Sequence, residues 1–221
     1  MSVRQCVLDT ETTGLSVAQG HRVIEIGVVE IIDRVVTGNN YHVYLNPERP
    51  IDAAATKVHG ITDNFLLDKP KFIEVNKEFQ EFISDSELLI HNASFDVGFI
   101  EQEWIYLGLE QKVKDVCIVI DTLSLARKKF PGQKNSLDIL CKRLGVDLSR
   151  RQDHGALLDS QLLAAVYLLM TSSQVKLGLS HNDVENKHNF AFEGHTDSLL
   201  NLQVPPASLL AHQELIKQLK K

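Results

Sequence analysis

Apolar runs and helical periodicity alternate along the chain as far as Thr171. Short apolar runs bounded by turn residues predict five strands, at 3–9, 22–33, 40–46, 87–91 and 117–121. Longer segments with helix-type apolar spacing predict five helices, at 72–83, 95–107, 122–129, 135–144 and 156–171. Strands first, followed by helices that alternate with strands, predict an α/β fold with a mixed sheet flanked by helices.

The second predicted strand is strongly apolar. The run from Val23 to Ile32 predicts a mostly buried central strand, with Glu25 and Glu30 as exceptions. The turn residues Gly38-Asn39-Asn40 come before the next predicted strand. This arrangement predicts that the two strands form an antiparallel pair.

The character of the chain changes after Met170. Residues 171–201 are rich in Ser, Asn, His, Asp and Gly and lack apolar periodicity, which is typical of a flexible linker. Helical spacing returns after Pro205-Pro206, where the apolar face consists of Leu209, Leu210, Ile216 and Leu219. A short amphipathic helix cannot bury such a face alone, so it is either frayed or docked on a partner. We therefore predict a globular domain at 1–173, a linker at 174–204 and a helical tail at 205–221.

The composition restricts the class of protein. The 221 residues are 43% hydrophobic, enough for one sizeable domain and an appendage. No apolar run is long enough to span a membrane, and the start of the chain lacks the pattern of a signal peptide. The three cysteines Cys6, Cys117 and Cys141 lack zinc-site spacing and fit a reducing compartment. These features predict a cytoplasmic location and no membrane partner.

Three short motifs carry candidate chemistry, and the first is VLDTETTG. It places Asp9 and Glu11 at the end of a predicted strand. Because side chains on a strand alternate between its faces, Asp9 and Glu11 point the same way and Thr10 points opposite. Two adjacent carboxylates repel each other unless a cation lies between them. Taken alone, the motif is better explained as an ordinary solvated strand end.

The second and third motifs are HNASFDVGF and HGALLDS. Ser94 is a plausible N-cap, which places Asp96 in the first turn of a helix that begins near Phe95. In the third motif a helix begins at Ala156 and carries Asp159 in its first or second turn. The preceding loop holds His154, because a continuous helix would turn the two side chains about 140° apart. Each motif alone also fits an ordinary helix start.

Together, and in this order, the motifs resemble the histidine-bearing (DEDDh) branch of the DEDD exonuclease superfamily. Longer stretches, such as GHRVIEIGVVEI and HGALLDSQLLAAVYLLMT, are similar to the family of epsilon subunits of bacterial DNA polymerase III. The resemblance extends from about Val7 to Thr171. It implies the ribonuclease-H-like exonuclease fold and a 3′→5′ exonuclease that removes mispaired 3′ nucleotides as 5′-monophosphates.

The resemblance also implies a role for each motif residue. Two divalent ions, Mg²⁺ or Mn²⁺, would be held by Asp9, Glu11, Asp96 and Asp159, and His154 would be the general base. This set is chemically sound, because hard ions prefer carboxylate oxygens and a neutral imidazole accepts a proton from water. The implied substrate pocket consists of Thr10, Glu11, Leu15, His59, Asn92, Phe95 and Asp159. One departure from the family is Ala54, where relatives often have a glutamate five residues before the pocket histidine.

Partners are implied in the same way. The family tail binds the polymerase (alpha) subunit, which assigns Leu209, Leu210, Ile216 and Leu219 to that contact. The segment QVKLGL has the form of a sliding-clamp peptide, with Gln174, Leu177 and Leu179 as its anchors. Whether a small theta-like subunit binds stays open.

The net charge of −6 is unusual for a protein that binds DNA 3′ ends, because phosphate neutralisation dominates such binding. A partner that holds the DNA would compensate by raising the local concentration of the 3′ end. Basic residues gather at Arg127, Lys128, Lys129 and Lys134 and at Arg150 and Arg151, as a DNA-binding patch or as solvated helix ends. Two alternative functions remain, a stand-alone DEDDh exoribonuclease and a structural subunit of a polymerase core.

Overall fold

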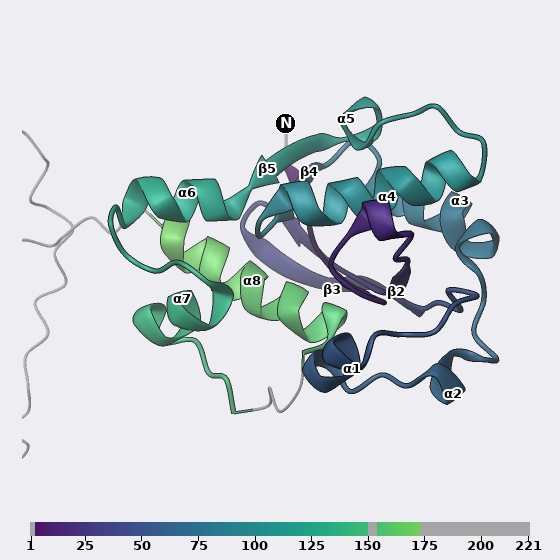
Figure 1. Cartoon of the computed structure of the whole chain (residues 1–221). Helices are drawn as coiled ribbons and strands as arrows, with labels where there is room; N and C mark the ends of the chain where they lie inside the picture. Colours follow the sequence, from purple (N-terminus) through teal and green to yellow (C-terminus); the bar gives the residue numbers. More distant parts are fainter. Residues whose placement is uncertain (1–2, 150–153, 173–221) are drawn as a thin grey trace, which may run out of the picture. The chain divides into compact units, whose positions relative to one another are not determined.

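The computed structural model of the chain describes residues 3–149 and 154–172 (Figure 1). These residues belong to one compact unit, Met1–Gln174, and the second unit is Val175–Lys221. The predicted clamp peptide, the whole predicted linker and the whole predicted tail lie outside the described residues.

A five-stranded mixed sheet forms the centre of the described unit. Its strand order is β3-β2-β1-β4-β5. The strands are β1 (Arg4–Thr12), β2 (Val23–Ile32), β3 (Val35–Tyr44), β4 (Glu87–Ile90) and β5 (Ile118–Asp121). The pairs β1–β2 and β2–β3 are antiparallel, whereas β1–β4 and β4–β5 are parallel. The predicted mixed sheet is confirmed.

The five predicted helices are all present. They are α3 (Phe72–Ile83), α4 (Ala93–Tyr106), α6 (Thr122–Lys129), α7 (Leu137–Leu144) and α8 (Ala156–Thr171). Four shorter elements have no counterpart in the sequence prediction, namely η1 (Val17–Gln19), α1 (Ala53–His59), α2 (Asp63–Leu66) and α5 (Val113–Val116). No helix among the described residues has the length and apolar character needed to cross a lipid bilayer.

Helices cover both faces of the sheet, with α3 and α4 on one face and α8 on the other (Figure 1). Alternation along β1 divides its side chains between the two cores. Cys6 and Leu8 pack in the cluster that contains α3 and α4, whereas Val7 packs in the cluster that contains α8. Because the alternation continues, the odd-numbered Asp9 and Glu11 lie on the face of α8.

The β2–β3 hairpin corrects one detail of the sequence prediction. The strands are antiparallel as predicted, but the turn lies at Asp33-Arg34, where φ is 48° and 67°. Positive φ at both residues fits a tight two-residue hairpin turn. The segment Gly38-Asn39-Asn40 lies inside β3, which begins at Val35 instead of residue 40. An exposed edge strand tolerates such turn-type residues, because only one side of it is paired.

The two acidic residues of β2, Glu25 and Glu30, are buried, although the other residues of this strand are apolar. Glu30 accepts a hydrogen bond from Arg4 Nε at 2.7 Å. One carboxylate oxygen of Glu25 lies 2.7 Å from His42 Nε2. Buried carboxylates require such partners, because an unpaired charge is poorly tolerated in a protein core.

Gly27 determines how closely α8 approaches the sheet. A Cβ atom at this position would lie 2.3 Å from the backbone of Ala156 and of Leu157, so any larger residue would displace the start of α8. The hydroxyl of Ser160 donates to the Gly27 carbonyl at 2.8 Å and fixes the contact. Gly27 is also the ladder partner of Asp9, so the first turn of α8 lies directly beside the acidic part of β1.

Candidate functional site

A cavity of about 200 Å³ lies where β1 and β4 end, and we call it the catalytic cavity. All five residues of the three sequence motifs line it, namely Asp9, Glu11, Asp96, His154 and Asp159. The remaining lining residues are Thr10, His91, Asn92, Phe95 and Leu137, so no lysine or arginine is among them. The fold therefore brings together three segments that are far apart in the sequence, with an excess of acidic groups.

The strand β1 supplies Asp9 and Glu11 on one face and Thr10 on the other, as the alternation predicts. The hydroxyl of Thr10 donates to Asp96 Oδ1 at 2.6 Å. This bond joins β1 to the first turn of α4. Thr10 and Asp96 are 6% and 4% exposed, so the bond is shielded from solvent and fixes the position of the carboxylate.

The start of α4 corrects the predicted cap. Asn92, not Ser94, is the N-cap residue, and its φ of 70° lies in the left-handed region. Asparagine tolerates this region better than most residues, which permits a tight turn from β4 into α4. The Asn92 N–H donates to Asp121 Oδ1 at 3.1 Å and anchors the turn. Asp96 still falls in the first helical turn, as predicted.

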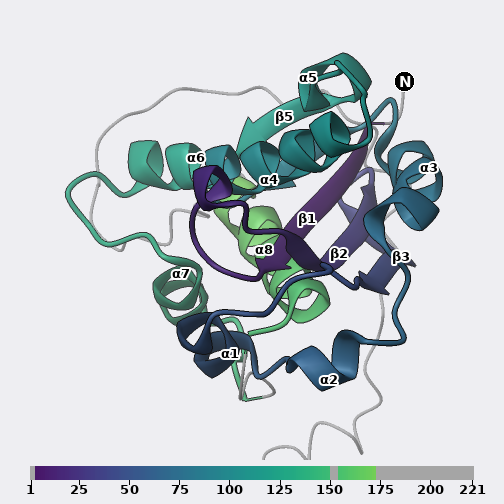
Figure 2. The ribbon, with the colours of Figure 1, turned by 45° about the vertical axis from the view of Figure 1, so that its right-hand side comes forward.

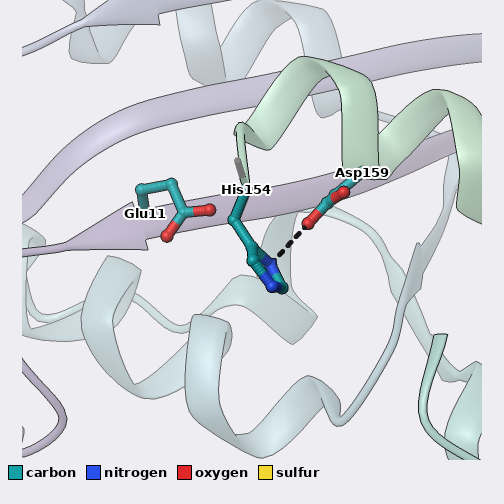
Figure 3. Close-up of side chains that lie close together, drawn as sticks. All are labelled: Glu11, His154 and Asp159. Atoms are coloured by element: carbon teal, nitrogen blue, oxygen red, sulfur yellow. Dashed lines mark hydrogen bonds and ion pairs between the residues drawn. The ribbon is translucent and has the colours of Figure 1, made fainter. Parts of the chain in front are cut away.

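The start of α8 supplies the remaining two groups. Gly155 is the N-cap residue, Asp159 lies in the first turn, and His154 stands outside the helix as predicted. The backbone N–H of His154 donates to the Val58 carbonyl in α1 at 3.2 Å, which holds the loop. Its Nδ1 lies 3.0 Å from Asp159 Oδ2 (Figure 3).

Glu11, His154 and Asp159 form the tightest group of potential ligands in the described part of the chain. One ligand atom from each lies within 4.8 Å of the others. Figure 3 shows Glu11 reaching from its strand and Asp159 from its helix toward the His154 side chain. Asp9 and Asp96 line the same cavity but do not belong to this tight group.

Burial raises the pKa of each acidic group for which a shift is resolved in the cavity. The pKa of Glu11 rises from its ordinary 4.5 to about 8, through burial and then through the nearby charge of Glu25. Burial raises the pKa of Asp96 from 3.8 to about 7, against the hydrogen bond from Thr10. The pKa of Asp9 lies well above its ordinary value because of burial and the charges of Asp96 and Asp159. A cation in the cavity would remove this unfavourable energy.

The donor set fits hard divalent cations. Four carboxylates offer oxygen ligands, which Mg²⁺ and Mn²⁺ prefer, and no lysine or arginine of the lining competes for them. The raised pKa values of Asp9, Glu11 and Asp96 mean that their ionised forms are unfavourable in this cavity, and a bound cation would stabilise those forms. The residues therefore suit a metal centre better than a structural ion-pair network.

The residues implied for substrate binding divide into two groups. Thr10, Asn92 and Phe95 line the catalytic cavity together with Glu11 and Asp159. Leu15 and His59 do not line it, since Leu15 is 85% exposed beyond β1 and His59 is buried at the end of α1. Ala54, the departure from the family pattern, is exposed on the same helix.

Sequence reasoning missed two residues of the cavity wall. His91 follows β4 directly, and its ring nitrogens lie 3.0 Å from Thr122 Oγ1 and 2.9 Å from the Asn135 carbonyl. Its place at the start of the HNASFD motif is a signal that could have identified it. Leu137 begins α7, and nothing in its local sequence marks it as part of the cavity.

Comparison with known proteins identifies the family. A family model described as Exonuclease matches residues 6–167. The DNA polymerase III subunit epsilon of Haemophilus influenzae is 48% identical, over 99% of this chain and 91% of that protein. The Escherichia coli subunit is 51% identical, over 87% of this chain and 77% of that protein. The chain belongs to the exonuclease family of the DNA polymerase III epsilon subunits. It is a nuclease of the DEDDh type, a class that depends on divalent metal ions.

Solved structures agree on the fold of this exonuclease. Exonuclease X, in complex with 5′ overhanging duplex DNA, superposes with a TM-score of 0.60 at 28% identity and covers 75% of this chain and 90% of that one. The nuclease domain of 3′hExo, a DEDDh family member bound to rAMP, gives 0.62 at 19% identity and covers 76% and 90%. The ribonuclease-H-like exonuclease fold predicted from the sequence is thereby confirmed.

The raised pKa values predict how stability depends on pH and metal. Between pH 4.5 and 8, Glu11 is ionised in the unfolded chain but stays largely protonated in the folded protein. In chelator, the free energy of unfolding is therefore expected to fall as the pH rises through this window. Mg²⁺ should raise the melting temperature more at pH 8 than at pH 5, because protons compete with the ion for the carboxylates.

Thermal unfolding at both pH values, with chelator and with Mg²⁺, measures this effect. Glu11→Gln is the matched variant, because it keeps the side chain's shape and removes its titration. In this variant the dependence on pH should be weaker. A melting temperature in chelator that does not change between pH 5 and pH 8 would contradict the burial of an uncompensated acidic cluster.

Proposed function

We propose that this exonuclease proofreads DNA replication: it removes mispaired nucleotides from DNA 3′ ends as 5′-monophosphates, as the epsilon subunit of a DNA polymerase III. The observation that carries the proposal is the convergence of Asp9, Glu11, Asp96, His154 and Asp159 on one cavity. Their acidity is otherwise unexplained, because a purely structural subunit has no use for a cluster of carboxylates that repel one another. The relatives at 48–55% identity are polymerase subunits by name, which favours replication over RNA trimming.

The proposed chemistry divides the roles among the residues. The charges of Asp96, Asp159 and Glu11 all act on Asp9. Asp9 would therefore contact both ions, while Glu11 and Asp159 would hold the first and Asp96 the second. Two such ions, Mg²⁺ or Mn²⁺, stabilise the attacking and leaving oxygens of a phosphoryl displacement. His154 would accept the proton of the attacking water, and the adjacent Asp159 carboxylate orients its ring. Asn92 and Phe95 line the side of the cavity where the terminal nucleotide would bind.

The small size of the cavity supports a mechanism in which mispaired 3′ ends are selected because they unpair more easily than matched ends. A volume of about 200 Å³ is small compared with the roughly 300–1,000 Å³ of ordinary ligand pockets, so the site suits an unstacked end rather than a duplex. Fraying a correctly paired end costs about 1.4 kcal/mol per stacked step, and a mismatch has already lost part of that stabilisation. Mispaired ends should therefore be cut faster than matched ends, and the difference should shrink on heating.

Digestion of a 5′-labelled primer tests the proposal. The primer is matched or mispaired at its 3′ end, and each form is incubated with Mg²⁺ or with chelator. Products should shorten one nucleotide at a time from the 3′ end, only with metal, and faster from the mispaired primer. Equal rates on both primers at low temperature would refute melting as the basis of selection. An RNA strand of the same sequence tests the exoribonuclease alternative.

The proposed partners follow the relatives' assignment to DNA polymerase III and the sequence beyond the described residues. Leu209, Leu210, Ile216 and Leu219 would bind the polymerase alpha subunit, and Gln174, Leu177 and Leu179 the sliding clamp. A small theta-like subunit is a further candidate. The replisome of a bacterium is cytoplasmic, and we propose the same location for this chain.

Truncation tests the proposed tether. Burial of leucines on a partner contributes about 1.5–3 kcal/mol each, so loss of the four apolar residues should abolish stable association. A chain ending at Thr171 is expected to keep its activity on a short single strand but not to co-elute with the alpha subunit. A full-length chain carrying Ile216→Asp and Leu219→Asp should behave in the same way. Stoichiometric co-purification of the truncated chain would place the contact on the nuclease domain.

A further inference from the structure

Glu25 is a buried carboxylate beside the proposed metal ligand Glu11. The two residues are ladder partners on the antiparallel strands β1 and β2, so their side chains leave the sheet on the same face. Figure 2 shows β1, β2 and β3 side by side, and α8 packs against β1 and β2 on this face. Glu25 is 2% exposed and does not line the catalytic cavity. Its carboxylate therefore acts on the cavity from within the core.

The carboxylate of Glu25 is held between β3 and the start of α8. His42 Nε2 lies 2.7 Å from Glu25 Oε1, and the His42 ring packs against the ring of Tyr44 with centroids 4.9 Å apart. A Cβ atom at Gly155, the N-cap residue of α8, would lie 4.0 Å from both oxygens of Glu25. Gly155 directly follows His154. Glu25 therefore lies against the segment that carries the proposed general base.

The other buried acid of β2, Glu30, has a complete set of partners. Its Oε1 accepts a hydrogen bond from Arg4 at 2.7 Å. Its Oε2 accepts from Thr37 Oγ1 at 2.9 Å and from Asn39 Nδ2 at 3.3 Å. In Glu25, by contrast, Oε2 is buried and makes no hydrogen bond within the described residues. A buried carboxylate oxygen without a donor is costly unless a positive charge lies close by.

The position of Glu25 beside Glu11 indicates where that positive charge would bind. Among the charges that raise the pKa of Glu11, the charge of Glu25 has the largest effect, second only to burial itself. Like charges directly opposite each other in a β-ladder are unfavourable. A cation bound at Glu11 reverses the sign of the interaction, because the carboxylate of Glu25 then attracts the ion.

We propose that Glu25, anchored by His42, is a positioning residue for metal binding at Glu11. Repulsion from Glu25 directs the Glu11 carboxylate away from β2 and toward the ion, and the charge of Glu25 strengthens the binding of that ion without contact. This inference rests on the proposed function, since Glu11 is one of its metal ligands. Residues that support a ligand from outside typically contribute about 10–100-fold to metal affinity.

Binding of Mn²⁺ alone to the full-length chain tests the proposal without catalysis, with the free ion measured by electron paramagnetic resonance at one pH. Glu25→Gln should weaken Mn²⁺ binding by about 10–100-fold. Glu30→Gln is the matched control, because it makes the same exchange at a buried acid of β2 that lies opposite Cys6 and not opposite Glu11. This control should bind Mn²⁺ like the wild type. His42→Leu removes the anchor and should resemble Glu25→Gln, whereas His42→Gln keeps a donor and should recover most of the affinity.

Hydrolysis of a single-stranded oligothymidylate gives a second readout that a merely structural role would not move. In Glu25→Gln the Mg²⁺ concentration for half-maximal rate should rise by the same factor as the Mn²⁺ dissociation constant, while the rate at saturating Mg²⁺ stays close to that of the wild type. A rate that falls equally at all Mg²⁺ concentrations would overturn the positioning role.

Three binding results would also contradict the inference. Unchanged Mn²⁺ affinity in Glu25→Gln would overturn the role of Glu25 and leave the proposed function intact, and so would an equal loss of affinity in Glu30→Gln. Equal affinities of His42→Leu and His42→Gln would overturn the anchoring by His42, and this pair carries the test if Glu25→Gln does not fold. A wild-type chain that binds no Mn²⁺ would overturn the proposed metal site itself.

Discussion

Asp159→Asn is expected to abolish hydrolysis of a DNA 3′ end while the protein still folds. Asp159 is 3% exposed in the first turn of α8, and Gly27 lets this turn approach Asp9 closely. An amide is a poor ligand for a hard divalent cation compared with a carboxylate. Metal stabilisation of the transition state amounts to several kcal/mol, so the rate should fall by at least about a thousandfold.

The same substitution should not destabilise the metal-free protein. The charge of Asp159 contributes to the raised pKa of Asp9, and its removal relieves that repulsion. In chelator, the melting temperature should therefore stay the same or rise, and Mg²⁺ should raise it less than in the wild type. Asp68→Asn is the control, because that side chain is 78% exposed and does not line the catalytic cavity. Near-normal hydrolysis by Asp159→Asn would remove the two-metal account.

His154→Ala is expected to slow hydrolysis by about 10²–10⁴-fold, the usual contribution of general-base catalysis. The side chain is 43% exposed at the cavity and contacts Asp159, so its loss should leave the fold and the four carboxylates in place. The shape of the pH–rate profile should also change, because general-base catalysis by this residue is lost. Full pH–rate profiles of both proteins, at saturating Mg²⁺, measure both effects.

A companion variant separates the chemical role of His154 from its packing. His154→Gln keeps a polar side chain of similar reach but has no basic group, so it should be as slow as His154→Ala. Recovery of most of the activity in His154→Gln would mean that the side chain only positions water. An unchanged pH–rate profile in either variant would assign the base to another residue.

The longer elements could be predicted because each carries its own periodic pattern. The helices at 72–83 and 122–129 have the predicted bounds. The short helix α1 (Ala53–His59) has too few residues for a periodic signal, and part of its surroundings comes from a distant segment, since His154 binds the Val58 carbonyl. The hairpin turn was placed wrongly because Gly38-Asn39-Asn40 is a stronger turn signal than Asp33-Arg34, although the bulged, exposed edge strand accommodates it.

The sequence could predict the residues of the candidate site where local backbone geometry determines which way a side chain points. Strand alternation places Asp9 and Glu11 on one face, and the first helical turn places Asp96 and Asp159. The packing that brings these groups together was not predictable, since only the structure reveals the close approach of α8 at Gly27. Residues of the wall that come from other elements carry no local signal either, as Leu137 at the start of α7 illustrates.

The most direct test of the central claim is the anomalous scattering of Mn²⁺ in crystals that contain thymidine 5′-monophosphate. The account predicts two peaks about 4 Å apart in the catalytic cavity, within ligand distance of Asp9, Glu11, Asp96 and Asp159. The thymidine phosphate should bridge the two ions. A single peak, or no peak, in this cavity at saturating Mn²⁺ would contradict the account.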